Sequence, residues 1–188
     1  MRFIRLITVV FMMVFALPAY AVDFVAEIGA HTGGDTMVKS NTADGSIENL
    51  RAGEGFSVAA GFGFAMGKST DLLLTFGMKQ EVIYPANGRI SFVRYPIDLL
   101  FMFKSDKWAY GFGVTAHMNP LYKEETETSK QTVDFDNATG YLLDVRYVVF
   151  EDVFVSGRYT SIEYEVEDDL SNTTVQGNSI GILVGIKL

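Results

Sequence analysis

Bulky apolar residues occupy every second position in several segments of this chain, and this alternation constrains the fold more than any other feature. In the segment GFSVAAGFGFAM (55–66), Phe56, Val58 and Phe62 lie on one side of the alternation, and Ser, Ala and Gly lie on the other. A period of two residues predicts β-strands, because successive side chains of a strand point to opposite faces of the sheet. Two further segments alternate as cleanly: WAYGFGVTAHMN (108–119) and IGILVGIKL (180–188).

The other apolar segments fit the alternation less well and raise the number of predicted strands to eight. They are 23–33, 72–79, 93–103, 141–149 and 153–166. The joints between strands alternate in length. Tight joints occur at 67–71, 104–107 and 151–152, and mostly longer, polar joints at 34–53, 84–89, 119–134 and 166–176. Because outer-membrane barrels have short turns at one end and long loops at the other, we expect an all-β fold, an eight-stranded antiparallel up-and-down transmembrane β-barrel.

A soluble β-sandwich or lipocalin-like barrel is the competing fold, since it also alternates. The second face of such a fold meets water and carries many Lys, Glu and Thr residues. Here the second face of three strands is chiefly Gly, Ala and Ser, which suit the crowded interior of a narrow barrel. Aromatic residues near strand ends, including Phe103, Trp108 and Tyr141, match the aromatic girdles of membrane barrels. Both observations favour the membrane barrel.

The first 21 residues have the layout of a secretory signal peptide. Arg2 and Arg5 precede the apolar run LITVVFMMVFAL, and the small-residue motif AYA (19–21) follows it. We expect cleavage after residue 21, which leaves 22–188 as the barrel domain; an uncleaved N-terminal anchor is the alternative. Loss of the two arginines changes the net charge from −8 to −10. An acidic chain lacks the basic surface that nucleic-acid binding requires, so we expect no nucleic-acid partner.

The segment GYLLDVRYVVFEDVFVSGRYTSIEYE (140–165) resembles the hairpin of small opacity-type and OmpA/OmpX-like porin-family barrels, in which a tight acidic turn follows an aromatic-rich strand end. The final SIGILVGIKL is similar to the C-terminal strand that the barrel-assembly machinery reads in that family. The chain departs from the family by ending in Leu188 where members commonly end in Phe. The resemblance implies a monomer at the cell surface of a Gram-negative bacterium, integral to the outer membrane and in contact with its lipid and lipopolysaccharide.

The interior of an eight-stranded barrel is just wide enough for side chains, so we expect a filled lumen rather than an open channel. By strand parity, ten polar residues point inward: Glu27, His31, Lys79, Glu81, Arg94, Asp98, Asp144, Arg146, Arg158 and Lys187. Since buried charges without partners cost several kcal/mol, we expect these residues to form ion pairs and hydrogen bonds. A gated ion path is the alternative. Pro96 lies within a strand and cannot donate a ladder hydrogen bond, so we expect a bulge at Tyr95–Pro96.

No catalytic or metal-binding pattern is present in the sequence. The two histidines, His31 and His117, lie in no recognisable nucleophile–base motif, and the chain has no cysteine and no zinc or calcium motif. We therefore expect no enzyme activity and no cofactor. A lipid A-modifying barrel enzyme is kept as an alternative, because such an enzyme would need a nucleophile and a base near the lipid.

Acidic residues gather in two of the expected outer loops. They are Glu124, Glu125 and Glu127 in one loop, and Glu165, Glu167, Asp168 and Asp169 in another. A solvated rim is the simplest interpretation; binding of divalent cations shared with lipopolysaccharide phosphates, or of a basic partner, is the functional one. The function we favour is a plugged barrel with a structural or surface-interaction role through its loops. Passage of small or apolar molecules across the outer membrane is the alternative.

Overall fold

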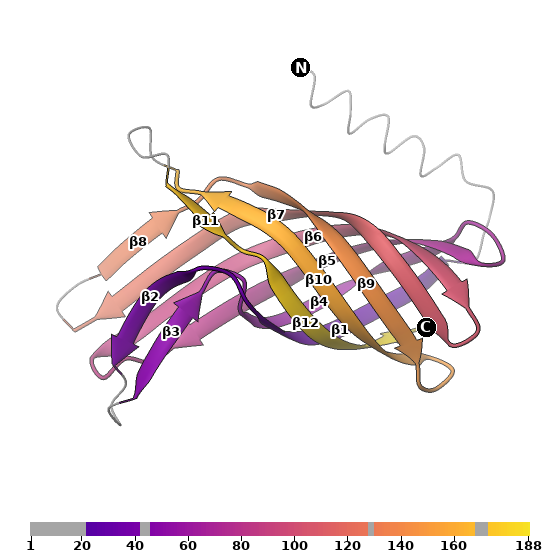
Figure 1. Cartoon of the computed structure of the whole chain (residues 1–188), viewed down its shortest axis with the longest axis horizontal. Helices are drawn as coiled ribbons and strands as arrows, with labels where there is room; N and C mark the ends of the chain where they lie inside the picture. Colours follow the sequence, from indigo (N-terminus) through magenta and orange to yellow (C-terminus); the bar gives the residue numbers. More distant parts are fainter. Residues whose placement is uncertain (1–21, 42–45, 128–129, 168–172) are drawn as a thin grey trace, which may run out of the picture.

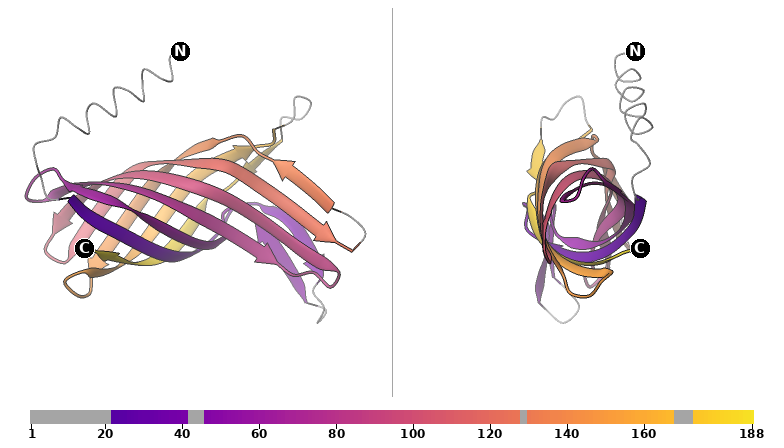
Figure 2. Two further views of the ribbon diagram at one scale, coloured as in Figure 1. Left: turned by 180° about the vertical axis from the view of Figure 1, so that it is seen from behind. Right: turned by 90° about the vertical axis from the view of Figure 1, so that its right-hand side faces the viewer.

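The computed structural model describes residues 22–41, 46–127, 130–167 and 173–188. Eight long strands form a closed ring in which each pairs antiparallel with the next, and β1 pairs with β12 to complete it (Figures 1 and 2). The predicted all-β, eight-stranded barrel is therefore confirmed. The ring strands are β1 (Val22–Thr32), β4 (Gly55–Ala65), β5 (Thr70–Ile83), β6 (Gly88–Ser105), β7 (Trp108–Thr126), β9 (Ala138–Val148), β10 (Val153–Glu165) and β12 (Ser179–Lys187).

The predicted signal peptide lies outside the described residues, so its cleavage stays a prediction. None of the described residues belongs to an apolar helix of membrane-spanning length.

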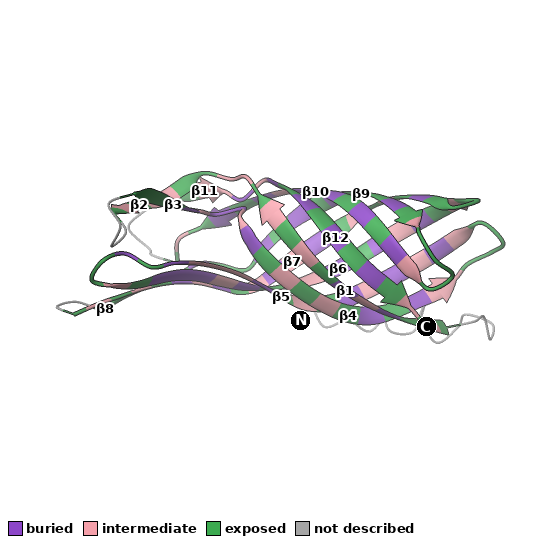
Figure 3. Ribbon diagram, turned by 90° about the horizontal axis from the view of Figure 1, so that it is seen from below, coloured by how far each residue is buried: buried purple, intermediate pink, exposed green. Residues whose placement is uncertain are grey.

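Burial alternates along each ring strand, as Figure 3 shows by its chequered colouring. In β9, Tyr141, Leu143 and Val145 are exposed on the outside, whereas Leu142 and Asp144 are buried inside. The outer surface is therefore a continuous apolar belt. Because water does not cover such a surface favourably, the belt suits the hydrocarbon of a bilayer.

The two ends of the barrel differ. Both described termini, Val22 and Leu188, lie at the end that also holds the tight turns at 66–69, 106–107 and 149–152 (Figure 1). We call this the terminal end, and the opposite one the loop end. Aromatic rings mark the terminal end of the belt, where Trp108 stacks with Tyr110 and lies 4.8 Å from the ring of Tyr147.

The long polar joints contain short strands that the sequence analysis did not assign. Residues 34–53 contain a hairpin of β2 (Thr36–Asn41) and β3 (Ile47–Arg51). Residues 119–134 are mostly strand, because β7 continues to Thr126 and β8 (Lys130–Asp134) pairs with it, and β11 (Thr174–Gln176) pairs with β10. These extensions are stable because they bury sparse apolar residues against one another. The resulting loop-end cluster comprises Leu50, Ala52, Ile83, Ile90, Phe92, Tyr122, Phe135, Ala138, Ile162 and Tyr164.

The bulge expected at Tyr95–Pro96 lies elsewhere. The β6–β7 register shifts between Val93, which pairs with Leu121, and Tyr95, which pairs with Met118. The extra residue is therefore on β7, at Asn119–Pro120, where Asn119 has a φ of 46°. Pro96 itself pairs regularly with His117, and the ladder from β6 to β5 is interrupted opposite it, where its missing N–H would have donated.

Candidate functional site

The lumen holds the polar side chains, arranged in levels along the barrel axis. From the terminal end towards the loop end, a salt-bridge layer comes before a basic layer, and the loop-end cluster follows the basic layer. The salt-bridge layer consists of Glu27, Asp98, Asp144, Arg146 and Arg158, all less than 9% exposed. The basic layer consists of His31, Lys79, Arg94 and His117.

Arg158 is the centre of the salt-bridge layer. Its Nη1 lies 2.8 Å from Oε1 of Glu27 and 3.1 Å from Oδ2 of Asp98, and its Nε lies 2.8 Å from Oδ2 of Asp144. Arg146 is more distant, with Nη2 3.5 Å from Oε2 of Glu27 and Nε 3.9 Å from Oδ1 of Asp144. The hydroxyl of Thr115 donates to Asp98 over 2.6 Å. These contacts neutralise charges that would be costly to bury alone.

The salt-bridge layer spans the barrel. Its members come from β1, β6, β9 and β10, so Arg158 joins strands from different sides of the ring. Apolar side chains pack on its terminal side, among them Leu73, Leu100 and Phe154. The guanidinium of Arg146 lies over the Phe154 ring at 3.6 Å. The layer therefore brings charged side chains from four strands together inside the narrow lumen of an eight-stranded barrel.

The basic layer differs in having no ion pair among the described residues. Lys79 Nζ donates to the Ser179 hydroxyl over 3.2 Å. Arg94 donates to the backbone carbonyls of Glu54 and Phe92, and its guanidinium lies 4.5 Å from the centroid of the Phe92 ring. Positive charge is thus concentrated above the salt-bridge layer.

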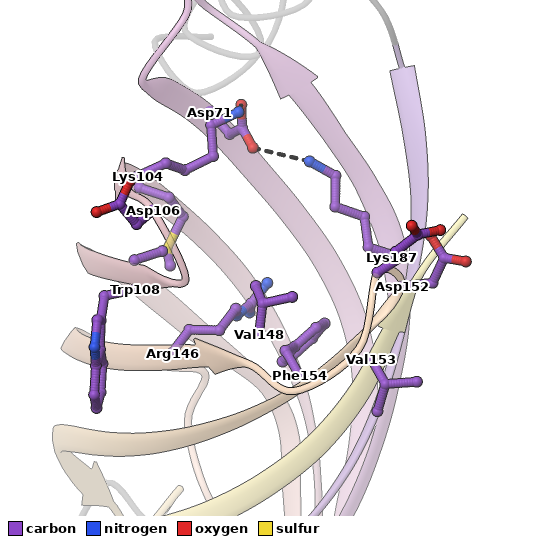
Figure 4. Close-up of a pocket in the computed structure, with 13 residues that line it drawn as sticks. Asp71, Lys104, Asp106, Trp108, Arg146, Val148, Asp152, Val153, Phe154 and Lys187 are labelled. Carbon is purple, nitrogen blue, oxygen red and sulfur yellow. Dashed lines mark hydrogen bonds and ion pairs between the residues drawn. The ribbon is translucent and has the colours of Figure 1, made fainter.

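A vestibule of about 210 Å³ opens at the terminal end (Figure 4). Lys187 Nζ lies 2.8 Å from Asp23 and 3.0 Å from Asp71, and Lys104 Nζ lies 2.6 Å from Asp71. Arg146 lies at the inner side of the vestibule and is the one lining residue that also belongs to the salt-bridge layer.

The structure divides the ten predicted lumen residues into groups. Glu27, Asp98, Asp144, Arg146 and Arg158 form one network, as described above. Lys187 belongs to the vestibule, and His31, Lys79 and Arg94 to the basic layer. Glu81 follows Lys79 on β5 towards the loop end and is partly exposed. The sequence interpretation missed Asp71, because it assigned this residue to a tight turn. Asp71 has the same strand parity as the inward residues Leu73 and Thr75, and this parity could have identified it as a lumen residue.

The histidines lie in the lumen and not at the lipid surface. His31 Nε2 lies 2.8 Å from the Ser57 hydroxyl, a contact that the sequence gave no reason to expect. The other ring nitrogen of His31 is buried and has no hydrogen-bond partner in the described structure, so nothing orients the ring as a base. His117 is 4% exposed, and its Nδ1 lies 2.6 Å from the Tyr164 hydroxyl.

The structure regroups the acidic loop residues. An isolated bridge joins Phe135 to Val166, so that Asp136 lies opposite Glu165 and Asp134 lies opposite Glu167. We call these four exposed residues the acidic strip. The remaining predicted acids are separate: Glu124 accepts from the Tyr122 hydroxyl, Glu125 lies 4.0 Å from Lys130, and Glu127 is exposed. Asp168 and Asp169 lie outside the described residues.

No group of three or more His, Cys, Asp or Glu side chains among the described residues is arranged to hold a metal ion. A cation at the acidic strip would therefore have to take further ligands from another molecule.

Comparison with known proteins supports the fold. No family model and no curated protein matches the chain. Among solved structures, Neisserial surface protein A has a TM-score of 0.55 at 14% identity, over 89% of this chain and 97% of that one. Ail, the attachment invasion locus protein of Yersinia pestis, solved with the heparin analogue sucrose octasulfate, has a TM-score of 0.59 at 7% identity, with the same coverage.

The chain has the fold of a small outer-membrane β-barrel. At these identities the likeness concerns the fold, and the function has to be argued from the side chains of this chain.

Proposed function

We propose that this barrel resides in a bacterial outer membrane, has a lumen closed by its own side chains, and acts through the surface of its loop end. The observation that carries the proposal is the salt-bridge layer, in which Arg158 joins Glu27, Asp98 and Asp144 across the lumen. The loop-end cluster adds a second, apolar obstruction. A hydrated ion would have to break buried ion pairs and pass an apolar region, and both steps are unfavourable.

Single-channel recording in planar bilayers tests the closed lumen. We expect the refolded full chain to insert without producing stable conductance steps. An open porin recorded under the same conditions is the positive control for insertion and detection. Reproducible large steps from this chain would contradict the proposal.

The acidic strip is the part of the loop end that we propose as the interaction surface. Its cross-strand pairs place carboxylates opposite carboxylates, an arrangement that destabilises a ladder unless a cation binds there. We propose that divalent cations bridge the strip to lipopolysaccharide phosphates, or that a basic partner binds it. A polyanion such as the one bound to Ail does not suit a strip of this charge.

Binding to lipopolysaccharide vesicles with and without Mg²⁺ tests this role. We expect Mg²⁺ to strengthen binding of the wild-type barrel and to have a smaller effect on a variant with Asp136→Asn and Glu165→Gln. A variant with Glu151→Gln and Asp152→Asn, at a turn of the terminal end, serves as the control. Equal Mg²⁺ dependence in all three proteins would contradict the role of the strip.

Passage of apolar molecules through the wall is the second candidate. A groove of about 340 Å³ on β4 and β5 favours it, because the lining residues Phe56, Val58 and Met78 face outward. Uptake of an apolar tracer by cells with and without the protein tests this candidate, and equal uptake would exclude it.

We also propose that the chain is not an enzyme, since His31 and His117 face the lumen. Lipid A that changes on overproduction of the wild type, but not of a His117→Ala variant, would contradict this proposal.

A further inference from the structure

A small cavity lies in the lumen where the salt-bridge layer meets the basic layer. It has a volume of about 30 Å³, and Lys79, His31 and His117 border it. Glu27, Asp98, Arg158 and Thr160 complete most of its polar lining. A space of this size holds one water molecule or one ion of similar radius.

Lys79 lacks a counterion in the described structure. Lys79 is 4% exposed, and within the described residues its Nζ has one hydrogen-bond acceptor, the neutral hydroxyl of Ser179. An ammonium group carries three donors, so this contact satisfies only part of its capacity. A buried ammonium group without a negative partner is unfavourable by several kcal/mol.

The two carboxylates that border the cavity have other hydrogen-bond or ion-pair partners. Asp98 accepts from Thr115 and Arg158, and Glu27 lies within ion-pair distance of Arg158 and Arg146. Neither lies within 4.0 Å of Lys79 Nζ. The described lumen therefore places no carboxylate within ion-pair distance of this lysine. Arg94 adds positive charge on the same level, and the two histidines add ring nitrogens.

We propose that this cavity is a binding site for one monatomic anion of the chloride class, which serves as the counterion of Lys79. The ammonium group of Lys79 supplies the charge, and the Thr160 hydroxyl and the imidazoles of His31 and His117 border the ion. The volume excludes phosphate and sulfate together with their hydration, so the site is selective by size. Nothing in the proposed surface role requires this ion, and the two proposals are independent.

Bromide is a suitable probe, because it replaces chloride and gives an anomalous X-ray signal. Crystals of the full chain grown in sodium bromide should show an anomalous peak in the lumen next to Lys79 Nζ. A lumen without such a peak would overturn the proposal. This experiment uses the wild-type protein and does not depend on the folding of a variant.

Urea unfolding in detergent micelles supplies a measurement in solution. Sodium chloride is compared with sodium gluconate at equal ionic strength, since gluconate is too large for the cavity. Above the dissociation constant, each tenfold rise in chloride should raise the ratio of folded to unfolded wild-type protein about tenfold.

Matched variants separate a specific site from general salt effects. The Lys104→Met variant, which removes a lysine of the vestibule, should keep the chloride dependence of the wild type. The Lys79→Met variant should lose it. Absence of the dependence in wild type, or the same dependence in all three proteins, would overturn the proposal.

Discussion

Replacing Arg158 by methionine tests how strongly the barrel depends on the salt-bridge layer. The guanidinium of Arg158 is within 3.1 Å of Glu27, Asp98 and Asp144, and the residue is 5% exposed. Methionine retains much of the length and flexibility and removes the charge. Glu27 and Asp144 would then keep only Arg146, whose nitrogens lie 3.5 and 3.9 Å from their nearest oxygens. Asp98 would keep only the hydrogen bond from the Thr115 hydroxyl.

Removing one partner of a buried ion pair lowers the free energy of unfolding by about 3–5 kcal/mol. This loss corresponds to an increase of the unfolding equilibrium constant by a factor of roughly one hundred to a few thousand. We place Arg158→Met in this range, because three carboxylates lose their main partner while the side chain keeps much of its volume.

Urea unfolding in micelles, followed by the fluorescence of the single tryptophan, Trp108, measures this loss. Ser156→Ala is the control, because Ser156 lies on the same face of β10, is 2% exposed, and has no hydrogen-bond partner for its hydroxyl in the described structure. We expect the control to change the free energy of unfolding by less than about 0.5 kcal/mol. If Arg158→Met is as stable as wild type, the carboxylates are solvated and the argument for a closed lumen fails.

Three further predictions concern the belt, the loop-end cluster and the acidic strip. Leu143→Arg, in the middle of the outward face of β9, should lower the free energy of unfolding in bilayers by about 2–4 kcal/mol, whereas Thr139→Arg, nearer the loop end on the same face, should lower it by about 0–1 kcal/mol; equal losses would show that the belt is misplaced. Phe92→Ala should destabilise the loop-end cluster by about 3–5 kcal/mol and speed hydrogen exchange at the loop ends of β5 and β6, and unchanged exchange would refute the packing argument. Asp136→Asn with Glu165→Gln should raise the free energy of unfolding without Mg²⁺ by about 0.2–1 kcal/mol, measured by urea titration; a loss of stability would mean that the carboxylates are not repelling one another.

Strand parity accounts for most of what could be predicted from the sequence. Because side chains alternate with a period of two residues, Asp98, Asp144 and Arg158 fall on the inward face whatever their partners are. Which of them meet depends on the stagger of the whole ring, because Asp98 and Arg158 are 60 residues apart. Local pattern contains no information on that stagger, so the ion pairs themselves could not be predicted.

The loop end was the least predictable part of the fold. Its apolar residues, such as Leu50, Phe135 and Tyr164, are separated by polar residues and lie in different segments. No single segment has a strong alternating pattern, since the cluster forms only when several hairpins come together. The bulge was misplaced for a similar reason. A proline identifies a missing donor in its own strand, whereas the extra residue that adjusts the register lies in the neighbouring strand.

The seam between β1 and β12 has a consequence for the order in which the barrel is built. Glu27 belongs to the first ring strand, and its closest cation, Arg158, belongs to the last strand but one. The two meet only after β12 has paired with both β10 and β1, so a sheet that is still open holds these charges apart. The carboxylate of Glu27 thus gains its Arg158 partner only when the barrel closes. In a chain that lacks β12, Glu27 would not have this ion pair. Closure therefore completes the ion pairs of Glu27 in a step that couples the two ends of the barrel.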